Sequence, residues 1–174
     1  MAMRAGLIPL LGLLAALGLS LVGCGARPDD AHDVRVRVDR VVIDDNDSPV
    51  VVLEEEGGTR WLPIWIGSAE ARSIALEMES MRSPRPNTHD LARDLIRHLD
   101  AEVARAVVTE LREGTYYASL LLKRGGHLLP IDARPSDAIA IALRAHAPIF
   151  VREPLFDLSH ADDASDGKSP QPEI

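Results

Sequence analysis

One stretch of the chain combines a strand, a polar turn and the start of a helix, and it restricts the fold more than any other. It is residues 129–143, Leu-Pro-Ile-Asp-Ala-Arg-Pro-Ser-Asp-Ala-Ile-Ala-Ile-Ala-Leu. Pro135 is favoured at a first helical position because its missing N–H is not needed there. Asp137 then falls in the first turn, near the positive end of the helix dipole. The apolar run that follows predicts a helix buried on most of its faces.

The same pattern occurs earlier in the chain, 67 residues upstream. Residues 62–76, Leu-Pro-Ile-Trp-Ile-Gly-Ser-Ala-Glu-Ala-Arg-Ser-Ile-Ala-Leu, align with residues 129–143 without a gap and are identical at seven of fifteen positions. Glu70 aligns with Asp137, so each copy carries a carboxylate in its first helical turn. This self-similarity predicts an internal duplication. Independent helix starts that converged on similar residues are the alternative.

Three strand-like segments precede each of these helices. Residues 34–43, 50–53 and 61–66 lead to the first helix, and residues 102–110, 116–123 and 127–132 lead to the second. Between the two units, residues 88–99 predict a helix with Thr88 as N-cap, and residues 149–151 predict a short last strand. Met78 and Met81 are expected to fill the core. We therefore expect an α+β domain with duplicated β-β-β-α units and an intervening helix.

Three motifs in order carry a family resemblance. They are residues 63–67 (Pro-Ile-Trp-Ile-Gly) with Glu70-Ala71, residues 84–91 (Pro-Arg-Pro-Asn-Thr-His-Asp-Leu) and residues 132–140 (Asp-Ala-Arg-Pro-Ser-Asp-Ala-Ile-Ala). Together they closely resemble the bifunctional nuclease (BFN) domain family, over roughly residues 34–158. The resemblance implies an α+β domain that is usually oligomeric, with DNase and RNase activity.

The N-terminal residues have the layout of a secretory signal. One basic residue, Arg4, precedes an apolar stretch, and Leu21-Val22-Gly23-Cys24 resembles a bacterial lipobox. The sequence thus predicts a signal peptide over 1–23, a lipidated Cys24, a tether over 24–33, a BFN-like domain over 34–158 and a disordered tail over 159–174. The expected location is the cell envelope, at the outer membrane if the source has two membranes. An ordinary signal peptide or an uncleaved anchor is the alternative.

The composition argues against a protein that simply clings to nucleic acid. The formal net charge is −8, whereas non-specific binding to phosphates depends on an excess of Lys and Arg. Two Trp, two Tyr and two Phe offer little surface for base stacking. A locally basic or metal-bridged site remains open.

The first candidate cluster surrounds the start of the intervening helix. His89 is the best candidate for a general acid or base because imidazole titrates near neutrality. Asp90 shares its helical turn, and Arg85 precedes it in a Pro-rich segment where a guanidinium could clamp a phosphate. The alternative is structural, with Asp90 favouring the helix start and His89 bonded to the loop backbone.

The second cluster lies at the start of the helix in the later copy. Asp132 and Asp137, with Glu70 from the first copy, are candidates for acid–base work and for binding Mg²⁺ or Mn²⁺. On the resemblance, Arg134 and Ser136 are substrate-binding candidates together with Arg85, and His89, Asp90, Asp132 and Asp137 are the catalytic candidates. The alternative is an Asp132–Arg134 ion pair, with Ser136 and Asp137 serving the helix start.

Two functions follow from these observations. The leading hypothesis is an envelope-tethered, homo-oligomeric nuclease that hydrolyses phosphodiester bonds of DNA or RNA, assisted by Mg²⁺ or Mn²⁺. The alternative is a non-catalytic binding or structural module of the cell envelope with the same fold, which the acidic charge favours.

Overall fold

A computed structural model describes residues 33–58 and 60–157. The predicted signal peptide, Cys24 and the tail over 159–174 lie outside the described residues. Along the chain run β1 (Asp33–Ile43), β2 (Pro49–Glu55), β3 (Trp61–Trp65), α1 (Ser68–Met78), α2 (Thr88–His98), β4 (Glu102–Arg112), β5 (Thr115–Arg124), β6 (His127–Ala133), α3 (Pro135–Ala145) and β7 (Ile149–Arg152). The expected order of three strands and a helix, an intervening helix, and again three strands and a helix is confirmed.

The seven strands form one sheet in the order β3-β2-β1-β7-β4-β5-β6. Each group of three consecutive strands is an antiparallel meander. The last strand, β7, joins the two meanders, because it pairs antiparallel with β1 and parallel with β4. This near-symmetric order agrees with two similar units. Their common origin by duplication stays a prediction.

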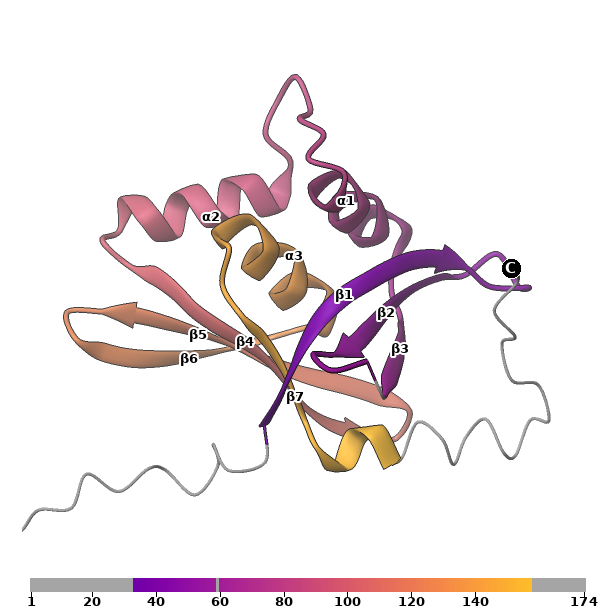
Figure 1. Cartoon of the computed structure of the whole chain (residues 1–174). Helices are drawn as coiled ribbons and strands as arrows, with labels where there is room; N and C mark the ends of the chain where they lie inside the picture. The colour runs from indigo at the N-terminus through magenta and orange to yellow at the C-terminus, as the bar shows by residue number, and fades with distance from the viewer. Residues whose placement is uncertain (1–32, 59, 158–174) are drawn as a thin grey trace, which may run out of the picture.

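The three helices gather over one side of the sheet, and α3 lies between α1 and α2 (Figure 1). α3 contacts both of the other helices and also packs on β4 and β5. The expectation that this helix is buried on most of its faces is confirmed, since seven of its eleven residues are buried. The first turns of α1 and α3 are thereby held close together, although they are far apart in the sequence.

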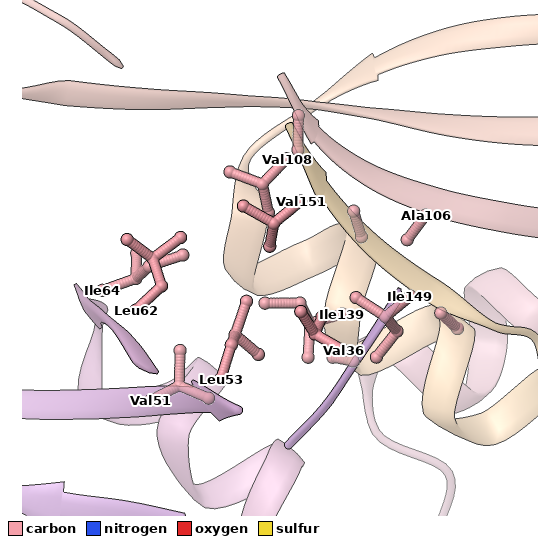
Figure 2. Close-up of a cluster of buried hydrophobic side chains, with 14 of the residues drawn as sticks. Val36, Val51, Leu53, Leu62, Ile64, Ala106, Val108, Ile139, Ile149 and Val151 are labelled. Carbon is pink, nitrogen blue, oxygen red and sulfur yellow. The ribbon is translucent and has the colours of Figure 1, made fainter. Parts of the chain in front are cut away.

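The core lies between these helices and the sheet. Figure 2 shows side chains of the first meander converging with those of α3 and β7. Ile139, Val151 and Phe156 are fully buried, and Phe156 comes from the single helical turn at residues 154–157. The burial of these apolar side chains is the main stabilising contribution that fixes the helices on the sheet.

Two local expectations are wrong. The N-cap of α2 is Asn87 and not Thr88, because the Asn87 side chain accepts hydrogen bonds from the backbone N–H groups of His89 and Asp90. Met78 and Met81 do not fill the core, because they lie at and beyond the end of α1 and are exposed.

Among the described residues, none of the helices has both the length and the apolar character needed to span a bilayer.

Candidate functional site

The first turns of all three helices meet at one open pocket of about 380 Å³. Glu70 lies in the first turn of α1, His89 in that of α2 and Asp137 in that of α3, and all three line the pocket with Arg134. No side chain caps the starts of α1 and α3. Helix N-termini favour anions because of their free N–H groups and positive dipole ends. The backbone at the starts of α1 and α3 therefore favours an anion, whereas the carboxylates of Glu70 and Asp137 oppose one.

Arg134 joins the two copies of the repeated stretch. Its Nη2 donates to Glu70 Oε1 at 2.6 Å, while Nε donates to Asp137 Oδ2 at 2.7 Å and Nη2 to Asp137 Oδ1 at 3.0 Å. Glu70 and Asp137, the aligned carboxylates of the two copies, thus bond to one guanidinium that lies between them. The Arg134 side chain remains 64% exposed, so its free edge is open to a ligand.

His89 lies behind Asp137 and is almost fully buried. Its Nε2 is 3.1 Å from Asp137 Oδ1, and its Nδ1 is 2.9 Å from the hydroxyl oxygen of Ser73 on α1. The structural alternative expected the His89 side chain to bond to the loop backbone. The side chain bonds to two other side chains instead. His89 links an α1 hydroxyl to an α3 carboxylate.

Counting donors fixes the proton on this imidazole. The Ser73 hydroxyl oxygen accepts hydrogen bonds from Arg144 Nη2 at 2.9 Å and from Asn87 Nδ2 at 3.2 Å. Its own hydrogen is then left to donate to His89 Nδ1, because Arg144 and the amide nitrogen have no acceptor to offer. His89 Nε2 carries the ring proton and donates it to Asp137. In this arrangement His89 orients the carboxylate.

A second, buried ion pair supports the start of α2. Arg144 near the end of α3 is 2% exposed, and its Nε donates to Asp90 Oδ1 at 2.6 Å. Asp90 Oδ2 accepts from the backbone N–H of Asn87 and so completes the capping box of α2. The predicted helix-favouring role of Asp90 is confirmed. A continuous chain of hydrogen bonds thus runs from Asp90 through Arg144, Ser73, His89 and Asp137 to Arg134 and Glu70.

The carboxylates of this network are held in the ionised form. The hydrogen bond from Arg134 lowers the pKa of Glu70 below its ordinary value. Burial alone raises the pKa of Asp137, but the hydrogen bonds from Arg134 and His89 outweigh it and the net pKa is lowered. At Asp90, burial is likewise outweighed by the Asn87 N–H and Arg144, so that its pKa is lowered as well.

The remaining predicted residues lie outside this pocket. Arg85 is exposed on the segment between α1 and α2, and Asp132 is exposed near the end of β6. Neither lines the pocket, and Arg134 bonds to Glu70 and Asp137 instead of Asp132. Ser136 is buried and lines a neighbouring pocket that also contains Arg134. Roles for Arg85, Asp132 and Ser136 in binding or catalysis stay predictions.

Sequence reasoning missed two members of the network, Ser73 and Arg144. The signal for Arg144 is its place one helical turn after Ala140, on the buried face of an otherwise apolar helix. Nothing in the local sequence distinguishes Ser73 from an ordinary helical serine, because its partners lie 14, 16 and 71 residues away.

The described side chains do not fit a divalent metal ion as they stand. Within residues 33–58 and 60–157, no group of three or more His, Cys, Asp or Glu side chains lies close enough to hold one. Glu70 and Asp137, the two carboxylates that line the pocket, are already paired with Arg134. Mg²⁺ or Mn²⁺ therefore stays a prediction.

Comparison with known proteins shows the family to which the chain belongs. An uncharacterized protein of Mycobacterium tuberculosis is 50% identical over 105 residues, which are 60% of this chain and 62% of that protein. Bifunctional nuclease 1 of Arabidopsis thaliana is 32% identical over 111 residues, covering 62% of this chain and 34% of that protein. Bifunctional nuclease 1 of Oryza sativa subsp. indica is 29% identical over 105 residues, covering 59% and 32%.

The chain thus spans about three fifths of the mycobacterial relative and a third of the plant relatives. The model of the bifunctional nuclease domain matches residues 51–163, a range that contains every residue of the hydrogen-bonded network described above. The chain belongs to the bifunctional nuclease domain family.

Proposed function

We propose that the chain is a nuclease that hydrolyses phosphodiester bonds of DNA or RNA in the pocket of Glu70, His89, Arg134 and Asp137. One observation carries the proposal: an exposed guanidinium is held between two carboxylates where three helix N-termini meet. A guanidinium and helix N-termini are both suited to a phosphate group. The membership of the family and the names of the plant relatives support the same reaction class.

In the proposed mechanism, a substrate phosphate binds the open edge of Arg134 beside the starts of α1 and α3. Asp137 accepts a proton from the attacking water, whose oxygen bonds to phosphorus while the bond to the leaving ribose or deoxyribose oxygen breaks. The leaving oxygen takes a proton from solvent. His89 Nε2–H holds Asp137 in place, and Arg134 neutralises charge that develops on the phosphate.

The cleavage assay below also tests whether the reaction needs a divalent cation. Glu70 and Asp137 carry two negative charges against the one positive charge of Arg134, which disfavours a phosphate dianion or diester unless further positive charge is present. Arg72, an exposed residue that also lines the pocket, supplies one such charge. Mg²⁺ or Mn²⁺ is the other source we propose, and no catalytic step is assigned to it.

The test is a cleavage assay with the purified chain on end-labelled DNA and RNA, single-stranded and duplex, with Mg²⁺, Mn²⁺ or EDTA. We expect Asp137→Asn to lower the rate by about 100-fold or more, since it removes the proposed base. Glu110→Gln, an exposed carboxylate of β4 paired with Arg112, is the matched control and is expected to retain full activity. Cleavage that persists in Asp137→Asn would move the reaction to another site.

The alternative function is a non-catalytic module of the cell envelope. The observation that favours it is that Ser73, Asn87, Asp90 and Arg144 all satisfy one another within the fold. Absence of cleavage under every condition, with a folded protein, would favour this module over the nuclease.

For the leader, the proposal is a lipid anchor on Cys24. The support is the apolar segment after Arg4 and the sequence Leu21-Val22-Gly23-Cys24. Metabolic labelling with an alkyne-modified fatty acid in a bacterial host is expected to mark the wild-type chain and to leave Cys24→Ser unmarked. A wild-type chain that stays unlabelled and is secreted would favour an ordinary signal peptide.

We also propose a homo-oligomer. Three leucines spaced four residues apart along α2 and its C-cap, Leu91, Leu95 and Leu99, are 55%, 54% and 59% exposed. Such a stripe on one side of a helix is typical of a contact surface. Light scattering is expected to give a multiple of the monomer mass for the wild type and a monomer for Leu95→Glu. A monomeric wild type would contradict the proposal.

A further inference from the structure

We propose that a second pocket, lined by Trp65 and Tyr116, binds a nucleobase of single-stranded nucleic acid beside the phosphate site. The inference rests on the proposed nuclease function, because it names the substrate feature that the same site recognises. It assigns a role to two of the few aromatic residues in the chain.

The pocket has a volume of about 470 Å³ and is a neighbour of the pocket of Glu70 and His89. Its walls come from the end of β3, the turn between β4 and β5, and the first turn of α3. Trp65, Gly67, Tyr116 and Pro135 are among its lining residues. Arg134 lines both pockets. A nucleotide whose phosphate lies on Arg134 could therefore place its base in the pocket that Trp65 and the partly buried Tyr116 line.

Trp65 is held in one orientation although it is 57% exposed. Its indole Nε1–H donates to Asp44 Oδ2 at 2.9 Å. The other oxygen of Asp44 accepts from the backbone N–H groups of Asn46 and Ser48 at 2.9 and 2.8 Å, so the β1–β2 turn fixes the carboxylate. The hydrogen bond from Trp65 is also the leading cause of a lowered pKa at Asp44. An exposed indole fixed in this way is preorganised for stacking, because little side-chain freedom is left to lose on binding.

The other exposed tryptophan provides a matched comparison. Trp61 lies on β3 four residues before Trp65, so both side chains point to the same side of the strand. Trp61 is 46% exposed but does not line the pocket. A role that depends on aromatic surface alone would involve both residues, whereas a base site beside Arg134 involves only Trp65.

The proposed occupant is an unpaired base. Every base offers a π-face to an aromatic ring, so stacking tolerates all sequences. In a duplex these faces are already stacked and unavailable unless the nucleotide is extruded. The pocket therefore predicts a preference for single strands, loops and frayed ends over intact duplex.

The experiment measures binding apart from cleavage. The purified chain is titrated in EDTA into a fluorescein-labelled dT oligonucleotide and into an abasic oligonucleotide with the same number of phosphates, and anisotropy is recorded. We expect Trp65→Ala to weaken binding of the dT strand by about tenfold, the effect of losing one stacked base, and to leave abasic binding unchanged. Trp61→Ala is expected to change neither.

A second measurement does not depend on altering Trp65. In a Trp61→Phe variant, Trp65 is the only tryptophan, because the chain has two. Its fluorescence is expected to be quenched by the dT strand but not by the abasic strand. Thermal unfolding of all variants checks that the fold is intact.

The outcomes separate this inference from the proposed nuclease. Equal binding of the dT strand by wild type and Trp65→Ala, with cleavage retained, would overturn the base site and leave the nuclease standing. A second substrate is bis(p-nitrophenyl) phosphate, a small phosphodiester without a nucleobase. If the wild type does not cleave it, that result would count against the nuclease. A change of oligomeric mass in Trp65→Ala would identify the pocket as a subunit contact and would also overturn the base site.

Discussion

Two arginines bind carboxylates at opposite ends of one hydrogen-bonded chain, and their surroundings differ sharply. The Arg144 side chain is 2% exposed and bonds to Asp90 and Ser73, whereas the Arg134 side chain is 64% exposed and bonds to Glu70 and Asp137. A buried charge that loses its partner is costly, while an exposed pair contributes little to stability. The fold therefore depends on Arg144, whereas Arg134 is available for a ligand.

The largest effect is expected at the buried end. Arg144→Met removes the donor to Asp90, to the Ser73 carbonyl and to the Ser73 hydroxyl, so a partly buried carboxylate and a buried carbonyl lose their partner. We expect the free energy of unfolding to fall by about 3 kcal/mol. Urea denaturation followed by circular dichroism measures it. A loss below about 1 kcal/mol would show that the two arginines contribute alike to stability.

The exposed end is expected to behave in the opposite way. Arg134→Ala should change the free energy of unfolding by less than about 1 kcal/mol, because its ion pairs are solvent-screened. The same change should lower cleavage by about 100-fold, the usual cost of removing one donor from developing negative charge. Rates and urea midpoints are measured on the same preparation. An exposed arginine outside both pockets, Arg97 of α2, serves as control through Arg97→Ala.

The pH dependence of stability probes both ends together. Glu70, Asp90 and Asp137 all have a lowered pKa in the folded state. Their stabilising contribution is therefore complete above the ordinary carboxyl range, about pH 4, and it is lost as the pH falls through the lower folded-state values. Urea midpoints should stay level from pH 7 to 5 and decline below that. A midpoint that rises on acidification would contradict the assigned network.

Much of the fold could be predicted because its signals are local. The alternation of Val34, Val36 and Val38 predicts a strand, and the apolar run after Pro135 predicts a buried helix. The central position of β7 could not be predicted, since its four residues pair with the first strand of each meander. Pairing across such sequence distances leaves no local pattern.

The candidate site is likewise predictable only where the sequence carries a local signal. The alignment of the two copies predicts a carboxylate in the first turn of each helix, and Glu70 and Asp137 occupy these positions. The bond between His89 and Ser73 joins α2 to α1 through the fold alone. The family resemblance predicts a catalytic or metal-binding role for Asp132, which is exposed and lies outside the pocket. The sequence indicated the residue types, and the packing of α3 between the other helices determines which of them meet.

The smallest change in stability is expected for a substitution that moves the Glu70 carboxylate without removing it. A Cβ added at Gly67 would clash with the Glu70 carboxylate, the flexible end of a side chain. Gly67 has φ −74° and ψ 153°, which alanine adopts freely, so Gly67→Ala should change the free energy of unfolding by less than about 0.5 kcal/mol. Glu70 must swing away, and its bond to Arg134 is lost.

If Glu70 positions Arg134 for the substrate, Gly67→Ala should lower cleavage several-fold with no loss of stability. A double-mutant cycle with Glu70→Ala separates this from a direct effect of the added methyl group, since the two changes should not add if both act through the Glu70–Arg134 bond. Full additivity would mean that the methyl group acts on the substrate itself, so that the residue before α1 contacts the substrate. Unchanged cleavage in both single variants would leave Asp137 as the only carboxylate that positions Arg134.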